Sequence, residues 1–197
     1  MEASSVIDLK ENDFIAAGVF CKCYENPFQI TECIKIPKPG SKANKRLKSD
    51  LSYYKKLHKR GLKLNFIADY LGRCDTSLGN GYRYDCVRDH DLKVSKTLEF
   101  YLNQPETDLE DLYSKLYELG CYLVKNRILI SDLHFNNILI KVDTNGEISP
   151  VIVDGIGDRV MITALNIFPS LLESKIIRRW NRFARRQLDG NALVSLD

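Results

Sequence analysis

The residues best suited to chemistry lie in two short stretches in the second half of the chain. Asp132 is followed five positions later by the amide residue Asn137, and Asp154 follows after two short apolar runs. Carboxylate and amide oxygens are hard ligands of the kind that bind a divalent cation. This combination predicts a site that holds a metal ion together with phosphate groups.

The segment between Asn137 and Asp154 predicts a β-hairpin. Asn145-Gly146 is a strong hairpin signal, because both central residues of a type I′ turn need positive φ. If these two residues form the turn, Asn137 lies directly opposite Asp154 across the hairpin. The sequence therefore predicts that an amide oxygen and a carboxylate meet at one end of the hairpin, where they could bind magnesium.

The first part of the chain predicts strands around one helix. Extended segments bounded by turn residues are expected at residues 14–24 (interrupted by Gly18), 29–36, 66–73 and 81–87. A helix is expected at residues 43–60, where apolar residues recur at spacings of three and four. The polar residues 88–91 then suggest a hinge, and a second long helix is expected at residues 108–125.

Two charged residues stand out in this first part. Lys35 lies between two isoleucines on an expected strand, and Asp50 lies in the apolar stripe of the expected helix. An acid in such a stripe needs a cationic partner, and Lys35 is the natural candidate. The alternative is that both are ordinary surface charges, since lone charged side chains are mostly exposed.

Composition excludes several classes of protein. The hydrophobic share of 44% and the charged share of 28% are ordinary for a globular chain, so disorder is not expected. No apolar run is long enough to span a membrane, and Met1–Ser5 lacks the order of a signal peptide. The six cysteines show no zinc-ligand spacing, which favours buried free thiols in a reducing cytosol. A cytoplasmic location is therefore expected.

The net charge of +3 is unevenly placed, because residues 175–186 hold six basic residues and no acid. An apolar side of this segment alternates with an arginine-rich side, which predicts a helix. The helix could pack its apolar side on the larger of the two lobes that the hinge at residues 88–91 would separate. Alternatively, it could place the protein peripherally at the inner membrane surface, on anionic lipid or lipopolysaccharide. Nucleic-acid binding is not expected, since no aromatic platform accompanies the arginines.

In the order of these elements the chain resembles the protein-kinase-like superfamily over about residues 14–158. The resemblance implies an α+β fold with two lobes. A small antiparallel-sheet N-lobe would extend to about residue 87, and a reduced, mainly helical C-lobe would start at about residue 92. Both lobes would form a single domain that uses ATP and Mg²⁺.

The resemblance also implies roles for individual residues. Asp132 would accept the proton of the attacking hydroxyl, while Asn137 and Asp154 would bind the metal ion. Lys35 would contact the α- and β-phosphates and Asp50 would pair with it.

Two further positions would bind the nucleotide. Gly18 would belong to the loop that covers the phosphates, and Val87 would line the nucleotide site at the end of its strand.

Short motifs narrow the resemblance to the bacterial PhoP regulatory network protein family, a YrbL-like group. The similar motifs run nearly end to end and include Lys22-Cys23-Tyr24, Cys33-Ile34-Lys35-Ile36, Leu51-Ser52-Tyr53-Tyr54, Gly81-Tyr82-Arg83-Tyr84-Asp85 and Asn136-Asn137-Ile138-Leu139. The name of that family implies a regulatory connection to magnesium and envelope stress in bacteria.

Departures from protein kinases indicate the class of acceptor. Protein kinases cover the phosphates with a loop that contains several glycines (the glycine loop), and here Gly18 is the only glycine in that loop. Ile130 and Ser131 stand where protein kinases carry His-Arg, and no Ala-Pro-Glu motif follows Asp154. Asp132-Leu133-His134 instead resembles kinases of small molecules, and His134 could contact the γ-phosphate or make a structural hydrogen bond. We expect phosphoryl transfer to a hydroxyl of a small or lipid- or sugar-linked acceptor. The alternative is a pseudokinase that binds nucleotide without turnover.

Overall fold

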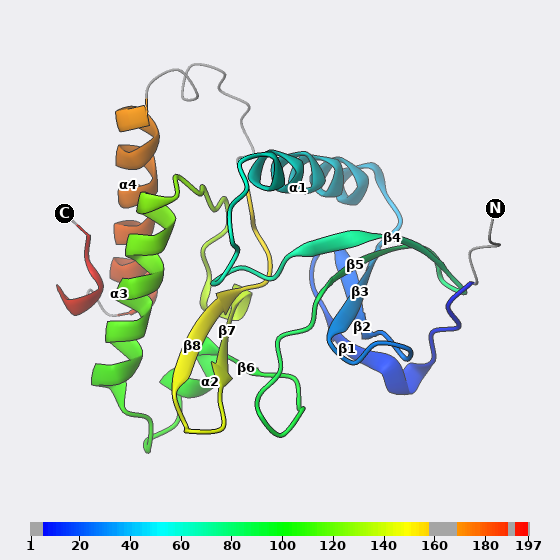
Figure 1. Ribbon diagram of the computed structural model, residues 1–197, viewed down its shortest axis with the longest axis horizontal. Coiled ribbons are helices and arrows are strands. Elements are labelled where there is room, and N and C mark those ends of the chain that lie inside the picture. Colours follow the sequence, from blue (N-terminus) through cyan, green and yellow to red (C-terminus); the bar gives the residue numbers. More distant parts are fainter. Residues whose placement is uncertain (1–5, 158–168, 189–191, 197) are drawn as a thin grey trace. The chain divides into compact units, whose positions relative to one another are not determined.

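The computed structural model describes residues 6–157, 169–188 and 192–196 (Figure 1). Met1–Ser5 lie outside these described ranges, so the prediction that the chain begins without a signal peptide concerns residues that are not described. The chain divides into two units, one of residues 1–59 and 68–87 and the other of residues 60–67 and 88–197. Within the described ranges, no helix is long and apolar enough to cross a membrane.

The first unit contains an antiparallel sheet of five strands. They are β1 (Phe14–Ala17), β2 (Cys21–Glu25), β3 (Glu32–Pro37), β4 (Tyr70–Thr76) and β5 (Gly79–Asp85), in the order β1-β2-β3-β5-β4. The mixed α+β class with an antiparallel sheet is thus confirmed. The expected strand start at Phe66 was wrong, because the Phe66 carbonyl accepts a hydrogen bond from the N–H of Ile152 in the second unit.

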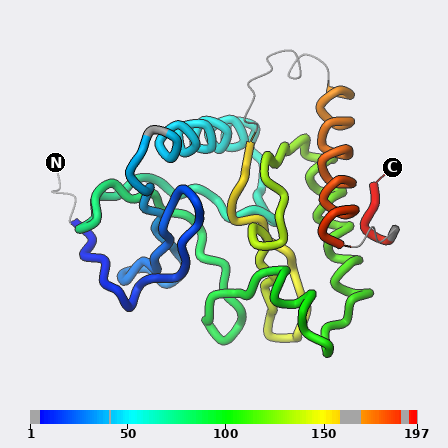
Figure 2. The backbone as a smooth tube through the Cα atoms, turned by 180° about the vertical axis from the view of Figure 1, so that it is seen from behind, coloured from blue at the N-terminus to red at the C-terminus, as the bar shows by residue number. Residues whose placement is uncertain are grey.

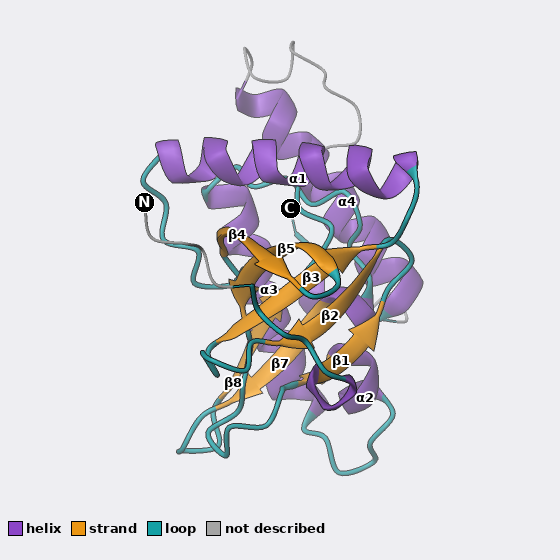
Figure 3. Cartoon of the chain, turned by 90° about the vertical axis from the view of Figure 1, so that its right-hand side faces the viewer, coloured by secondary structure: helices purple, strands orange, loops and turns teal. Residues whose placement is uncertain are grey.

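Helix α1 (Ser41–Lys59) covers one face of this sheet (Figure 3). Its Tyr54 is buried, with its ring centroid 5.8 Å from that of Tyr84 on β5. The Tyr54 hydroxyl donates to the carbonyl of Ala68 at 2.7 Å, so the one polar atom of this buried ring is satisfied. The helix expected at residues 43–60 is therefore confirmed, beginning two residues earlier.

The other face of the sheet has its own small core. It consists of Leu9, Tyr24, Ile34 and Ile36. The N-terminal segment reaches this core because Ile7 hydrogen-bonds through its N–H to Asp75 and through its carbonyl to Ser77. Figure 2 shows this segment beginning beside the turn between β4 and β5.

The second unit combines helices with a three-stranded sheet. The helices are α2 (Leu98–Leu102), α3 (Leu109–Lys125) and α4 (Pro169–Gln187), and the strands β6 (Lys96–Thr97), β7 (Ile138–Val142) and β8 (Ile148–Ile152) form a sheet in the order β6-β7-β8. Asp108 caps α3 by accepting hydrogen bonds from the N–H groups of Glu110 and Asp111, which explains why this helix begins where the sequence predicts. Helix α2 was not expected, since five residues are too few to show a periodic apolar pattern.

Helix α4 packs against α3, as Figure 1 shows. Trp180 is fully buried and donates its indole N–H to the carbonyl of Val194 at 2.7 Å. Gly120 of α3 leaves room for this ring, because a Cβ at that position would lie 2.7 Å from Trp180 Cε2. The apolar side of the basic C-terminal segment is therefore core, as one of the two interpretations predicted. Contact of its exposed arginines with an anionic membrane stays a prediction.

The β7–β8 hairpin forms, but its register differs by one residue from the prediction. Ile138 faces Ile152 and Val142 faces Ile148. The carboxylate of Asp143 accepts hydrogen bonds from the N–H groups of Asn145 and Glu147, and positive φ occurs at Gly146 but not at Asn145. The connection is thus a three-residue loop, in which a type I turn is followed by a left-handed glycine.

The register shift corrects the predicted pairing at the open end of the hairpin. The carbonyl of Asn137 accepts a hydrogen bond from the N–H of Val153, so Asn137 is not directly opposite Asp154.

Candidate functional site

The loop that carries Asp132 is attached to the segment that follows β8. Ile130 pairs with Ile156 in an isolated antiparallel bridge. Ser131 donates both its main-chain N–H (2.6 Å) and its hydroxyl (3.0 Å) to the carbonyl of Gly155. These bonds place residues 130–132 beside residues 154–156, although more than 20 residues separate the two stretches.

Gly155 allows a close approach to Asp132 that no other residue would permit. Its φ is +81°, and a Cβ at this position would lie 2.8 Å from both the Cβ and the carbonyl oxygen of Asp132. Both the backbone conformation and the available space therefore require glycine. Because Asp154 directly precedes Gly155, the two predicted carboxylates lie on adjoining segments of main chain.

Asn137 completes this arrangement. Its Nδ2 donates to the main-chain carbonyl of Asp132 at 3.0 Å. A carbonyl oxygen can only accept, so this contact fixes which end of the amide faces Asp132 and turns Oδ1 the other way. The second unit thus brings together Asp132, Asn137 and Asp154, the residues predicted for catalysis and metal binding.

The oxygen atoms of Asp132, Asn137 and Asp154 suit magnesium, which also binds water and phosphate, better than they suit a metal ion that takes all its ligands from the protein. The side chains of Asp132 and Asp154 are exposed, and Asn137 is half-buried. No group of three or more His, Cys, Asp or Glu residues suited to a metal ion occurs in the described part of the chain. Magnesium commonly binds one or two carboxylates and completes its shell with water and substrate phosphates, which Asp154 and the Asn137 amide oxygen could accommodate.

His134 makes the structural hydrogen bond that one interpretation predicted. Its Nδ1 accepts from the N–H of Asn136 at 3.2 Å, and its ring centroid lies 4.1 Å from that of Phe135. The ring thereby caps the short 3₁₀ turn η2 (Phe135–Asn137). A contact of His134 with the γ-phosphate stays a prediction.

Two residues of α4 that sequence reasoning did not assign to the site contact the Asp132 loop. Nη1 of Arg179 donates to the carbonyl of Ile130 at 2.9 Å, and Oε1 of Gln187 accepts from the N–H of Phe135 at 2.8 Å. In the sequence, Arg179 is one of several arginines in a basic segment. Only the packing of α4 distinguishes it from its exposed neighbours.

In the first unit, Lys35 and Asp50 have partners that the sequence did not suggest. Nζ of Lys35 lies 4.6 Å from the ring centroid of Tyr84, a cation–π contact. Asp50 is largely buried, and its Oδ2 lies 3.3 Å from Nε of Arg46 on the same helix. The expected need of Asp50 for a cation is thus met within α1. A pairing of Lys35 with Asp50 stays a prediction.

Gly18 lies in the connection between β1 and β2, where the glycine loop was expected. Its N–H donates to the carbonyl of Cys21 at 2.9 Å, so this group is already used within the hairpin. Val19 next to it is 80% exposed. Val87 is buried at the end of the first unit. Nucleotide contacts of Gly18 and Val87 stay predictions.

The cysteines are free thiols, as the sequence predicts, but three of them are not scattered in space. Hydrogen bonds with the thiols of Cys23 and Cys86, together with burial, raise the pKa of Cys33 well above its usual range. The predicted burial of the cysteines is confirmed only for Cys33, since the other five are partly buried. A high pKa keeps the Cys33 thiol protonated at neutral pH, which disfavours metal binding and nucleophilic reactivity.

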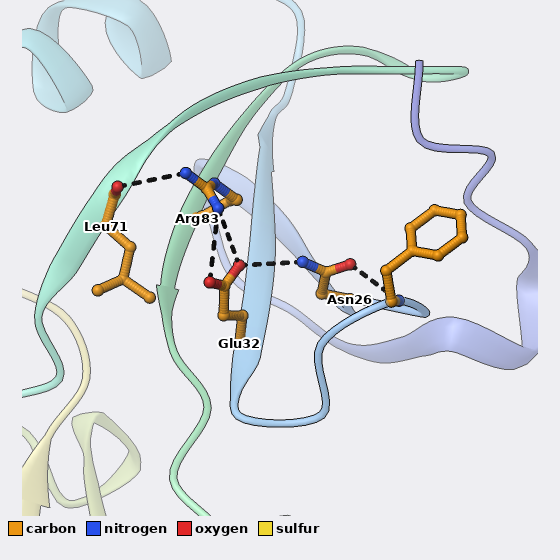
Figure 4. Close-up of polar contacts among 5 residues, drawn as sticks. Asn26, Glu32, Leu71 and Arg83 are labelled. Atoms are coloured by element: carbon orange, nitrogen blue, oxygen red, sulfur yellow. Dashed lines mark hydrogen bonds and ion pairs between the residues drawn. The ribbon is translucent and has the colours of Figure 1, made fainter. Parts of the chain in front are cut away.

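A surface pocket of about 510 Å³ lies in the first unit, and none of its lining residues is a predicted site residue. Several of its polar groups contact one another: Glu32 Oε2 lies 3.4 Å from Arg83 Nη1 and accepts from Nδ2 of Asn26 at 3.0 Å (Figure 4). Nη2 of Arg83 also donates to the carbonyl of Leu71 at 3.5 Å. These contacts indicate a structural ion pair between β3 and β5 at the edge of a pocket.

Most of the chain is similar in sequence to one family of known proteins. The sequence model of the family described as PhoP regulatory network protein YrbL matches residues 7–188. Proteins named "Uncharacterized protein YrbL" from Escherichia coli (strain K12) and Shigella flexneri are each 34% identical over 181 residues. The match covers 90% of this chain and 86% of each relative. The family match at residues 7–188 includes every predicted site residue.

Proposed function

The chain belongs to the family of PhoP regulatory network protein YrbL, and from this premise we propose that it is a phosphotransferase with a kinase-like fold. It would use ATP and magnesium to transfer the γ-phosphoryl group to a hydroxyl. The acceptor would be small or linked to lipid or sugar, since the protein-kinase features noted as missing serve peptide substrates and their regulation. We further propose that this activity serves bacterial envelope or magnesium-stress regulation, since the family is described by its link to the PhoP regulatory network.

One observation carries this proposal. Gly155 packs directly on Asp132 while the Asn137 amide donates to the Asp132 carbonyl, so two acids and an amide oxygen share one small region. Phosphoryl transfer asks a protein mainly to position the reactants and to neutralise developing negative charge. Short oxygen-bearing side chains on closely tied main chain suit the first task, and they could hold the magnesium ion that would perform the second.

Each predicted site residue named below would perform one task in the proposed reaction. Asp132 would orient the acceptor hydroxyl and take its proton as the oxygen bonds to the γ-phosphorus and the bond to ADP breaks. Asn137 and Asp154 would bind magnesium, which neutralises phosphate charge. Lys35 would contact the α- and β-phosphates, and Asp50 would help to orient it.

The test combines nucleotide binding with transfer. We expect ATP with magnesium, but not ATP with a chelator, to raise the melting temperature of the full chain. Labelled γ-phosphate should then appear on components of a bacterial lipid and sugar extract, and Asp132→Ala should reduce this labelling by about 10²- to 10⁴-fold. Absence of nucleotide binding, or near-normal labelling by Asp132→Ala, would reject the proposal.

A second candidate is a nucleotide-binding regulatory protein without turnover. It is favoured by one feature of the first unit, the N–H of Gly18, which donates to Cys21 within its own hairpin. A loop with few available N–H groups grips phosphates less firmly. Binding of ATP and magnesium without labelling of any acceptor would select this candidate.

A further inference from the structure

We infer that Arg179 and Gln187 of helix α4 are positioning residues for Asp132. Neither would touch substrate or metal. They act on the main chain of the loop that carries Asp132, and their catalytic consequence rests on the phosphotransferase function proposed above.

The two side chains contact the loop on either side of Asp132. Arg179 donates to the carbonyl of Ile130, two residues before Asp132, at 2.9 Å. Gln187 accepts from the N–H of Phe135, three residues after Asp132, at 2.8 Å. The eight-residue spacing of Arg179 and Gln187 corresponds to about 12 Å along a helix axis. One rigid element therefore contacts both ends of the loop.

The position of the main chain around Asp132 matters for its proposed role as a general base. Asp132 is exposed, whereas Ile130 just before it is buried. An aspartate has a short side chain, so the position of its carboxylate follows the main chain closely. The bond of Ser131 to Gly155 fixes one side of this main chain, and the two contacts from α4 fix it further.

Helix α4 is itself well anchored. Trp180, next to Arg179, is fully buried and hydrogen-bonded to Val194. Near the start of the helix, Glu173 forms an ion pair with Arg127 at 2.8 Å. The buried Trp180 therefore provides most of the support from which Arg179 and Gln187 can fix the loop, and the exposed ion pair adds little.

The contact of Arg179 with Ile130 also concerns a position at which this sequence differs from protein kinases. Ile130-Ser131 stands where protein kinases carry His-Arg before the catalytic aspartate, so the loop has no arginine of its own there. Arg179 brings a guanidinium to the carbonyl of Ile130 from another element. A general base displaced by about 1 Å can lose about 100-fold in rate, so this support matters for transfer.

The first experiment measures the loop without requiring activity. In amide hydrogen exchange by NMR, Gln187→Met should speed exchange at Phe135, because the acceptor of that N–H is lost. Gln187→Glu keeps an acceptor oxygen and should retain protection. Lys125→Met, which removes an exposed charge at the end of α3, serves as the control. Unchanged exchange at Phe135 in Gln187→Met would overturn the inference.

The second experiment measures the catalytic consequence. Arg179→Met and Gln187→Met should each lower kcat by about tenfold or more while KM for ATP stays unchanged. Arg179→Lys and Gln187→Glu should restore most of kcat. A purely structural role would instead lower the melting temperature and leave kcat of the folded protein unchanged, which would overturn the inference.

The two experiments also separate this inference from the proposed function. If the unsubstituted protein transfers no phosphate to any acceptor, the proposed function fails. The exchange measurement then decides alone whether α4 fixes the loop.

Discussion

In the second unit, the candidate residues are positioned by the main chain around them, whereas the two charged candidates of the first unit contact other side chains. Asp132 lies between main-chain hydrogen bonds at Ser131 and Phe135 and accepts another from Asn137. Lys35 instead lies over the ring of Tyr84, and Asp50 pairs with Arg46.

The difference follows from the length of the side chains and from what each must do. An aspartate that orients a hydroxyl can only be as well placed as its main chain, so its loop is tied at several points. A lysine that contacts phosphates has a long flexible stem and needs lateral support more than a fixed backbone. In the proposed reaction, the second unit would fix the geometry of Asp132 and the first would place the charge of Lys35.

The largest expected effect tests this division of roles. Asp132→Asn should reduce the rate of transfer by about 10²- to 10⁴-fold without changing the affinity for ATP and magnesium. Lys35→Met should weaken that affinity by about 1.5–3 kcal/mol, because a charge-assisted contact to phosphate is lost. Calorimetric titration and initial rates measure the two quantities. If both variants lost nucleotide affinity equally, the comparison between the units would fail.

A smaller effect compares the glycines of the two units. Gly155→Ala should destabilise the protein by about 3 kcal/mol, since alanine would adopt positive φ and clash with Asp132. Gly18→Ala should change stability by less than about 0.5 kcal/mol, because the nearest atom to its Cβ would be 3.8 Å away. Unfolding in urea measures both. Equal losses would show that the glycine loop is as tightly built as the Asp132 loop.

The smallest effect is a pH dependence expected in the first unit. Partial burial raises the pKa of Asp85, against the hydrogen bond from the N–H of Asp69. The folded state then binds this proton more tightly than the unfolded chain does. Stability contributed by protonated Asp85 should therefore be present at low pH and lost as pH rises through the raised pKa.

Asp85→Asn should flatten this dependence, and Asp8→Asn, at an exposed position of the same unit, should not. Thermal unfolding between pH 3 and pH 7 makes the comparison. A slope that Asp85→Asn leaves unchanged would assign the dependence to other groups.

Local patterns made much of the fold predictable. The helices at residues 41–59 and 109–125 follow from apolar spacing, and the second also from its Asp108 cap. The β7–β8 hairpin follows from its turn residues, but its register does not. The carboxylate of Asp143 selects a three-residue loop over a two-residue one, and such side-chain competition is not visible in a dipeptide signal.

The sequence by itself determined which residues could do chemistry, since the types and spacing of Asp132, Asn137 and Asp154 already predict an oxygen-rich site. The tertiary structure decided how these residues are held. Gly155 meets Asp132 across a long stretch of sequence, and Arg179 and Gln187 reach the loop from a helix some 50 positions later. The contacts of Arg179 and Gln187 depend on the packing of α4 around Trp180. Spacing along the chain carries no information about an interaction that forms only when distant elements pack together.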